Sequence, residues 1–378
     1  MSRHAHGIKP GEILPVCDEI ILPRQGQDVR RASSRMPWWN PRYWRKRVWA
    51  AVVASIVLLL VIVIAVAVIQ VRNNRYPDYS KVSYSLKDTY EGETFFDKFN
   101  YFTGFDPTHG LVHYVPQEQA QSLNLTYASS NSAFLRVDTS VGPQDEPNAS
   151  TGRFSVRVES KKTYNDGLFI FDIKHTPYGC GTWPALWLTD SSNWPDNGEI
   201  DVMEATNKAD DGNQMTLHSS SSCSMSVRRK ATGDALQKNC DSDENENAGC
   251  GVKSESDGYG TAFNNNGGGI MAMEWRDEGI RMWQFARGSI PSDIDNKKPD
   301  PSSWGTAVAD FPSTDCDIGS HFKNNTIVAN IDLCGDLVAA LWDGSGCSGT
   351  CEDLVKNHPE AFKNAYWEFG SFEVYQAS

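Results

Sequence analysis

An uncharged apolar run from Val48 to Ile69 limits how this chain can fold, because its 22 residues are interrupted by one polar side chain, Ser55. About 20 such residues form a helix that spans the hydrocarbon of a bilayer. A buried helix of a water-soluble domain would keep a polar face, which this run lacks. A cleavable signal peptide would have a shorter apolar region and a small-residue cleavage site. The run therefore predicts a transmembrane signal anchor over residues 48–71.

The charges around this run predict its orientation. Only Arg72, Arg75 and Lys81 follow it closely, whereas seven basic residues crowd its N-terminal flank: Arg30, Arg31, Arg35, Arg42, Arg45, Lys46 and Arg47. Cytoplasmic flanks are enriched in Lys and Arg. We therefore expect a single-pass type II protein with a disordered cytoplasmic tail over residues 1–47. The rest of the chain would be lumenal or extracellular, in the secretory pathway, at the cell surface or facing the cell wall.

The net charge of −13 is unevenly divided along the chain. Residues 1–75 carry 12 Lys and Arg against 4 Asp and Glu, whereas the remainder carries 23 against 44. An acidic domain disfavours nucleic acids and polyanions as partners. It is compatible with a neutral polymer.

Sequons and cysteines agree with an oxidising compartment beyond the span. Three N-glycosylation sequons begin at Asn124, Asn148 and Asn324. Only Cys17 precedes the span, and eight cysteines follow it: Cys180, Cys223, Cys240, Cys250, Cys316, Cys334, Cys347 and Cys351. They predict up to four disulfide bonds, for which about 105 pairings are possible. Their spacings lack paired zinc knuckles, so we expect no metal site.

Short β-type runs dominate the chain after a predicted stalk over residues 72–88. Within residues 89–378, turn-forming clusters of Gly, Asn, Asp and Pro separate the runs, and one short helix is predicted over 352–357. Residues 233–268 are rich in Asn, Asp and Gly and predict a long loop, tied down by cystines or packed over a cleft. The predicted strands are 111–115, 133–137, 154–158, 168–173, 269–275, 279–285, 326–331 and 367–375. This pattern predicts an all-β sandwich, most simply a β-jelly roll.

Three carboxylates, Glu199, Asp201 and Glu204, alternate with apolar residues in one predicted strand. Residues i and i+2 of a strand share a face, so Glu199 and Asp201 point the same way. Strict alternation would bury Glu204 in the core, where an unpaired carboxylate is costly. A one-residue β-bulge near Val202–Met203 would return Glu204 to the face of the other acids. The alternative is an ordinary acidic edge strand.

Aromatic residues flank the acidic strand. Trp183 and Trp187 share one face of the preceding predicted strand, and Trp194 lies in the turn that leads to the acids. Such rings stack on sugars, although a single Trp is more often core filler. His218 follows one strand later, where it has either a structural role or a role in the site.

At these residues the chain resembles glycoside hydrolase family 16, in its fungal laminarinase-like endo-1,3(4)-β-glucanase branch. The E-x-D-x-x-E pattern of residues 199–204 is specific in this setting, and the resemblance covers roughly residues 90–376. The motifs that carry it are 95–99, 106–110, 153–157, 178–187, 198–204, 216–218, 272–275, 287–291, 334–336 and 365–367.

The resemblance implies a concanavalin A-like jelly roll with a cleft on its concave face. It implies Glu199 as the nucleophile, Glu204 as the general acid/base and Asp201 as the carboxylate between them. It implies no cofactor. The expected cleft-lining residues are Trp183, Trp187, Trp194, His218 and Trp275.

Three functions are consistent with these features. The leading one is a retaining endo-β-glucanase that hydrolyses β-1,3 or mixed β-1,3/1,4 glucan through a glycosyl-enzyme intermediate. The second is a cell-wall glucan transglycosylase that passes the same intermediate to a sugar hydroxyl. The third is a non-catalytic glucan-binding protein of wall assembly.

Overall fold

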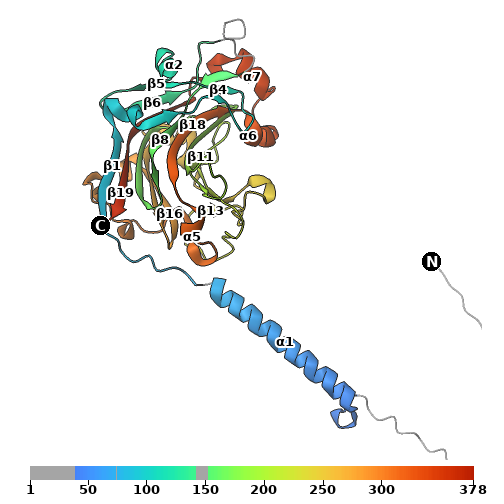
Figure 1. Ribbon diagram of the computed structural model, residues 1–378. Helices are drawn as coiled ribbons and strands as arrows, with labels where there is room; N and C mark the ends of the chain where they lie inside the picture. The colour runs from blue at the N-terminus through green and yellow to red at the C-terminus, as the bar shows by residue number, and fades with distance from the viewer. Residues whose placement is uncertain (1–38, 74, 142–151) are drawn as a thin grey trace, which may run out of the picture. The chain divides into compact units, whose positions relative to one another are not determined.

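The computed structural model describes residues 39–73, 75–141 and 152–378 (Figure 1). Most of the predicted tail, Cys17 and the sequon at Asn148 lie outside these residues. The chain divides into two compact units, residues 1–64 and 65–378, and the boundary falls within helix α1 (Lys46–Asn73).

Helix α1 is the one helix of the described residues that is long and apolar enough to cross a membrane. Its 28 residues include the predicted span, and none of its most apolar window is buried in protein. An apolar side chain left in water loses the free energy that burial would provide. The helix therefore has the composition of an anchor or a signal sequence.

Two eight-stranded antiparallel sheets form the β-domain (Figure 1). The first sheet has the order β17 (Ala309–Pro312), β16 (Gly279–Ala286), β15 (Gly269–Arg276), β9 (Gly167–His175), β19 (Tyr366–Ala377), β6 (Ala133–Arg136) and β5 (Thr126–Ala128), and β1 (Tyr84–Glu91) also pairs with β19. The second sheet has the order β13 (Asp234–Ala235), β14 (Cys250–Lys253), β12 (Gln214–His218), β11 (Glu199–Glu204), β10 (Thr182–Thr189), β18 (Asn325–Leu333), β8 (Arg157–Tyr164) and β2 (Phe99–Tyr101). The predicted jelly-roll sandwich is confirmed.

A third, smaller sheet and several short helices complete the domain. The small sheet consists of β3 (Gly104–Phe105), β4 (Val112–Tyr114) and β7 (Arg153–Ser155). The α-helices are α2 (Gln117–Ser122), α3 (Gly260–Asn265), α4 (Ser292–Asp295), α5 (Ile318–His321), α6 (Gly335–Leu341) and α7 (Cys351–Asn357), the last of which was predicted. The 3₁₀ turns are η1 (Pro41–Tyr43), η2 (Gly92–Lys98), η4 (Asn245–Asn247), η5 (Ser256–Gly258), η6 (Arg287–Ser289), η7 (Pro301–Ser303), η8 (Ser313–Asp315), η9 (Trp342–Gly344) and η10 (Pro359–Phe362).

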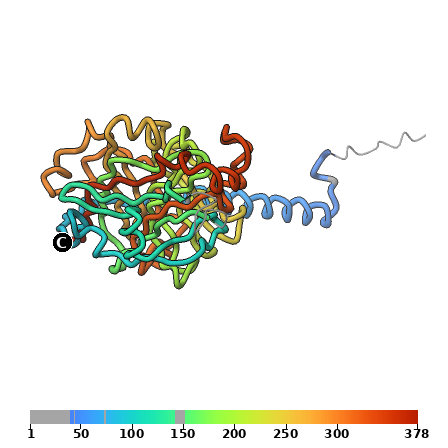
Figure 2. Tube along the Cα trace, turned by 90° about the horizontal axis from the view of Figure 1, so that it is seen from above, coloured from blue at the N-terminus to red at the C-terminus, as the bar shows by residue number. Residues whose placement is uncertain are grey.

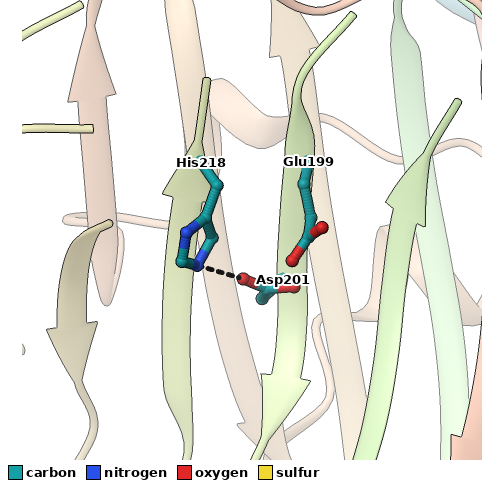
Figure 3. A group of neighbouring side chains, drawn as sticks. All are labelled: Glu199, Asp201 and His218. Atoms are coloured by element: carbon teal, nitrogen blue, oxygen red, sulfur yellow. Dashed lines mark ion pairs between the residues drawn. The ribbon is translucent and has the colours of Figure 1, made fainter. Parts of the chain in front are cut away.

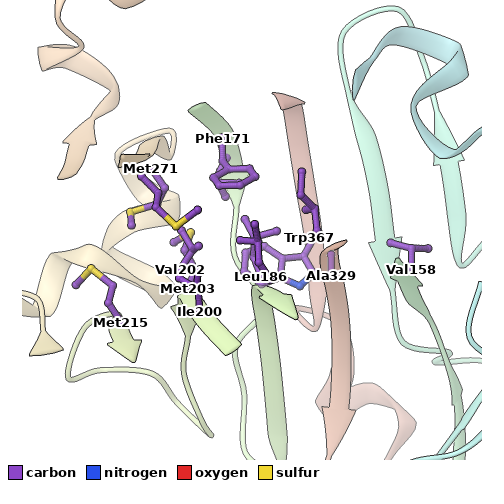
Figure 4. Close-up of a cluster of buried hydrophobic side chains, with 14 of the residues drawn as sticks. Val158, Phe171, Leu186, Ile200, Val202, Met203, Met215, Met271, Ala329 and Trp367 are labelled. Carbon is purple, nitrogen blue, oxygen red and sulfur yellow. The ribbon is translucent and has the colours of Figure 1, made fainter. Parts of the chain in front are cut away.

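The core lies between the two large sheets because alternate residues of their strands are apolar. Leu186 and Ile200 of the second sheet and Phe171, Met271 and Trp367 of the first belong to one buried cluster (Figure 4). The opposite face of the second sheet therefore remains available for polar residues.

The folded domain begins earlier than the sequence predicts. Strand β1 starts at Tyr84, inside the predicted stalk, and pairs with the last strand, so Figure 2 shows the C-terminus beside the blue-to-cyan start of the domain. Upstream, the Tyr79 ring lies 4.0 Å from the Arg281 guanidinium, and Lys81 forms an ion pair of 2.6 Å with Asp300. The stalk boundary at residue 88 is thus wrong, because this short polar strand has no alternation strong enough to mark it.

All eight cysteines beyond the span form disulfide bonds, as predicted. The pairs are Cys180–Cys347, Cys223–Cys316, Cys240–Cys250 and Cys334–Cys351. The Cys240–Cys250 bond closes a short loop within the Asn-rich segment. That segment is therefore held at the edge of the second sheet, beside β12 and β14.

Candidate active site

A β-bulge in β11 organises the site. Ala185 of β10 lies opposite Glu204, and Trp187 lies opposite Asp201, although the two β10 residues are two positions apart and the two acids are three apart. The bulge therefore places one extra residue at Val202–Met203, where the sequence predicts it. Both side chains of this dipeptide are fully buried, so the bulge sends two consecutive residues toward the core.

The bulge brings all three acids to the solvent-side face of the second sheet, which we call the acidic face. Glu199 and Glu204 are partly exposed, whereas Asp201 is only 3% exposed. Glu199 and Asp201 project from β11 toward His218 on the neighbouring strand β12 (Figure 3). A cluster of carboxylates on one face can divide the roles of nucleophile and acid.

His218 is held between the acids and the Asn-rich segment. Its Nε2 lies 3.3 Å from Asp201 Oδ2 (Figure 3), and its Nδ1 lies 2.9 Å from Asn247 Oδ1. With the amide oriented in this way, its oxygen can only accept, so Nδ1 carries a hydrogen. Gly249 packs closely against the His218 ring. It has φ +60°, and a Cβ at this position would lie 2.8 Å from His218 Cε1.

Glu204 is hydrogen-bonded to two neighbours, one at its carboxylate and one at its backbone. The indole Nε1 of Trp183 donates a hydrogen bond of 2.8 Å to Glu204 Oε1. The backbone N–H of Glu204 donates to Asn213 Oδ1 at 3.1 Å. A carboxylate fixed in this way presents its second oxygen in a defined direction, as a proton donor to a substrate must.

Burial and charge separate the protonation behaviour of these groups. Although Glu204 is partly exposed, the protein around its carboxyl group excludes water, and this desolvation raises the pKa of Glu204. The negative charge of Glu199 adds to this, while the Trp183 bond and the charge of His218 oppose it. Burial and Glu199 also raise the pKa of Asp201 well above its usual range. Burial would lower the pKa of His218, but the bond to Asp201 and the nearby carboxylates raise it to about 10. The Asp201–His218 pair therefore keeps a proton at neutral pH.

The same cluster has the spacing of a metal site. Ligand atoms of Glu199, Asp201 and His218 lie within 4.8 Å of one another. A ligating imidazole must be neutral, and the raised pKa of His218 opposes that. The residues thus fit a proton-holding cluster better than a resident cation.

Two further tryptophans lie on or beside the acidic face. The Trp187 Nε1 donates to Asn330 Oδ1 at 2.8 Å, and the Arg157 guanidinium lies 4.9 Å from the Trp187 ring. Trp194, in the turn before β11, is 42% exposed. Of the predicted residues, Trp183, Trp187 and His218 therefore lie beside the acids. Trp194 lies in the turn that leads to Glu199.

The prediction for Trp275 is wrong. This residue lies in β15 of the first sheet, is 1% exposed, and packs with its ring centroid 6.4 Å from that of Phe169. Met271, Met273 and Trp275 share the buried face of β15, so the ring belongs to the core between the sheets.

Three polar residues of the site were not predicted as site residues. Asn247 lies in the Asn-rich loop, and Asn330 lies in a predicted strand whose sequence gives no sign of a site. Arg157 belongs to an alternating run and to one of the family motifs, which was the only available signal. Their contacts depend on strand neighbours that are distant in sequence, so local patterns could not identify them.

In this jelly-roll sandwich, a β-bulge places a group of carboxylates on one face, among tryptophans. A pair of carboxyl groups placed in this way is typical of glycoside hydrolases. The chain matches the family described as XgeA-like, catalytic GH16 domain, over residues 99–375. It belongs to glycoside hydrolase family 16, in the branch of the fungal endo-1,3(4)-β-glucanases.

Curated relatives support this assignment. A probable glycosidase of Schizosaccharomyces pombe is 44% identical over 308 residues, which cover 80% of this chain and 72% of the relative. An endo-1,3(4)-β-glucanase of Arthroderma benhamiae is 42% identical over 79% of this chain and 66% of the relative. The chain spans less than half of several other relatives, such as the 48% covered in the xgeA endo-1,3(4)-β-glucanase of Emericella nidulans.

Solved structures agree in fold and sequence. Laminarinase 16A from Phanerochaete chrysosporium, solved with β-glucans in donor and acceptor sites, has a TM-score of 0.73 and 44% identity. A family 16 elongating β-1,3-glucosyltransferase has a TM-score of 0.72 and 40% identity. Each match covers 78% of this chain and 100% of the solved chain.

Proposed function

We propose that the β-domain is a retaining endo-β-glucanase in which Glu199 is the nucleophile and Glu204 the general acid/base. The observation that carries this proposal is the bulge at Val202–Met203, which turns Glu204 onto the face of Glu199. Without it, one of the two carboxyl groups would be buried in the core.

The first step forms the glycosyl-enzyme. The Glu199 carboxylate attacks the anomeric carbon, the glycosidic C–O bond breaks, and Glu204 gives its proton to the leaving oxygen. The raised pKa of Glu204 keeps this proton available. The Trp183 N–H then stabilises the Glu204 carboxylate that remains.

The second step releases the sugar. Glu199 is now esterified and uncharged, so the repulsion that raised the pKa of Glu204 is reduced and Glu204 can act as a base. It removes a proton from water, the new C–O bond forms, and the ester bond to Glu199 breaks. His218, paired with Asp201, stays protonated through both steps. Its positive charge lies beside the nucleophile and compensates the negative charge there.

The substrate proposed is a neutral β-1,3 or mixed β-1,3/1,4 glucan. The acidic balance of the domain disfavours polyanions, and the tryptophans around the acids offer faces on which pyranose rings stack. The named activities of the relatives at 42% and 38% identity favour the same substrate class.

Transglycosylation is the second candidate. It requires only that a sugar hydroxyl replaces water in the second step, and the elongating glucosyltransferase at 40% identity favours it. We further propose that α1 is a single-pass type II anchor, with the tail over residues 1–47 cytoplasmic and the glycosylated β-domain on the lumenal or wall side, so that the enzyme acts at the membrane beside the wall.

Product analysis tests this function. The full chain in detergent is incubated with laminarin, lichenan and pustulan, which differ in linkage, and the products are sized by mass. We expect shortened oligosaccharides from laminarin or lichenan and none from pustulan. Oligosaccharides longer than the substrate would establish transfer instead.

Glu199→Gln is the matched control because it preserves shape and removes the nucleophilic charge. Its melting temperature should remain that of the parent, and turnover should fall at least ~10³-fold. A Glu199→Gln protein with near-parental turnover would overturn the assignment. Binding of glucan by the parent without turnover would support the non-catalytic alternative.

A further inference from the structure

The small sheet presents a row of three aromatic rings on one face. Phe105 of β3 lies opposite His113 of β4, which lies opposite Phe154 of β7. The Phe105 and His113 ring centroids are 4.6 Å apart, and those of His113 and Phe154 are 6.3 Å apart. Directly opposed residues share a face, so the three rings form one row across the sheet. Its inner member, Phe154, is partly buried and packs against the core cluster, whereas Phe105 lies at the open end.

Phe105 is the outermost ring of this row. It is 70% exposed, more than any other large hydrophobic residue of the described β-domain. A large apolar ring left in water gives up the free energy of burial. Here the Phe105 ring also packs against the His113 ring, and this contact holds it in place at the edge strand of the small sheet. We call the three rings the platform.

The row lies next to the acidic face. Three residues before Phe105, Phe102 has its ring 4.9 Å from the Arg157 guanidinium, which lies equally close to the Trp187 ring. Phe102 also donates its backbone N–H to the Arg157 carbonyl at 3.0 Å. Three residues of chain span at most about 10 Å, so the platform begins within that distance of the stacked group beside the site.

We propose that Phe105, His113 and Phe154 form an outlying β-glucan-binding platform that holds the polymer where it leaves the active site beyond Trp187. This inference rests on the proposed function, because it takes the same glucan as the occupant. Phe102 and Arg157 connect the platform to the acidic face. A glucan chain bound at the acidic face can therefore extend onto the platform, which favours glucan over an unrelated ligand. The apolar C–H face of a glucosyl ring stacks on such a surface, and a neutral polymer meets no repulsion from the acidic domain.

The platform predicts a dependence on chain length. A short oligosaccharide occupies the site and does not reach Phe105, whereas a polymer contacts both. Removal of the outer ring should weaken polymer retention roughly 3- to 10-fold, the range expected for one aromatic stacking contact. The chemistry on short substrates should be unaffected.

The test compares Phe105→Ala with Tyr127→Ala, another exposed and stacked aromatic residue that lies on β5 of the first sheet. Each change is placed in the full-length Glu199→Gln chain in detergent, and retention on insoluble β-1,3-glucan particles is measured. The same changes in the active chain give kcat/KM on laminaritetraose. We expect weaker retention for Phe105→Ala alone, with kcat/KM within about twofold of the parent.

Equal retention by the Phe105→Ala and Tyr127→Ala proteins would overturn the platform while leaving the proposed function intact. So would an equal loss by Phe105→Ala on polymer and tetrasaccharide, or a change in its self-association in place of glucan retention. A parent chain that neither cleaves nor retains β-glucan would overturn the proposed function, and the platform with it.

Discussion

At the scale of single residues, Glu204 receives opposing influences from its neighbours. Burial and the charge of Glu199 favour its protonated form, whereas Trp183 and His218 favour its carboxylate. A group that gives a proton in one step and accepts one in the next needs both forms within reach. In the proposed mechanism, the indole bond of Trp183 therefore has a chemical role in addition to stacking on sugar.

Replacing Trp183 with Phe tests this role. The N–H that stabilises the carboxylate is lost, so the pKa of Glu204 rises and the residue stays protonated to higher pH. The alkaline limb of the kcat/KM profile should therefore move to higher pH. Loss of one hydrogen bond of about 1 kcal/mol should also reduce kcat/KM roughly fivefold at the optimum.

Trp187→Phe is the control, because its indole N–H bonds Asn330 and not a proposed catalytic carboxyl group. It should change KM without moving the alkaline limb. An unchanged pH profile for Trp183→Phe, or an equal displacement for Trp187→Phe, would argue against the role of the indole bond.

At the scale of elements, the conformation of β11 follows from the spacing of its acids. Glu204 comes three residues after Asp201, an odd number, whereas side chains on one face of a regular strand are an even number of residues apart. Alternation alone requires a bulge if Glu204 is to leave the core, and the register with β10 and β12 shows one. The same parity rule could not place Trp275, because the buried face of a strand depends on the sheet to which it belongs. The contact of Asn247 with His218 was likewise beyond prediction, since it arises from a loop folded back over β12.

The loop that carries Asn247 depends on Gly249. An alanine there would adopt φ near +60°, at a cost of about 1 kcal/mol, and its Cβ would displace Thr216 or His218. We expect Gly249→Ala to lower kcat at least ~10-fold, which corresponds to about 1.4 kcal/mol, if the new Cβ moves His218 away from Asp201. Steady-state kinetics together with the melting temperature measure this effect.

Gly305→Ala is the control that separates backbone strain at a positive φ from crowding of His218 by the new Cβ. Gly305 has φ +76°, and a Cβ there would meet no atom within 4 Å. This variant should lose a few degrees of melting temperature and keep parental kcat. If the two alanine variants behaved alike in kcat, crowding of His218 would not be the cause.

At the scale of the whole molecule, the sequence indicates two regions: an apolar segment with the composition of a membrane span, and a β-rich segment that contains eight cysteines. The apolar run became helix α1, and the eight cysteines beyond it paired completely. The eight-residue strand β1 was missed because its sequence, YSLKDTYE, mixes polar and apolar residues without regular alternation and is defined by pairing with β19. Long-range pairing of this kind is what a local pattern cannot contain.

Glycosylation tests the proposed orientation. Asn124 and Asn324 are both exposed in the β-domain, so a lumenal domain should carry glycans on them. Chain expressed in a fungal host should lose mass on endoglycosidase treatment, and Asn124→Gln and Asn324→Gln should each remove part of that loss. A chain of unmodified mass, fully degraded by protease added to sealed microsomes with the cytoplasmic side outward, would contradict the orientation.

The most direct test of the central claim is azide rescue of Glu199→Ala and Glu204→Ala, using an aryl β-laminaribioside with a good leaving group. In Glu199→Ala, azide replaces the nucleophile and attacks the substrate once, which inverts the anomeric centre and gives the α-glycosyl azide. In Glu204→Ala, azide replaces water on the glycosyl-enzyme and gives the β-glycosyl azide. The anomers are read by NMR. Our account predicts the α-azide from the first variant and the β-azide from the second; the reverse assignment, or the same anomer from both, would contradict it.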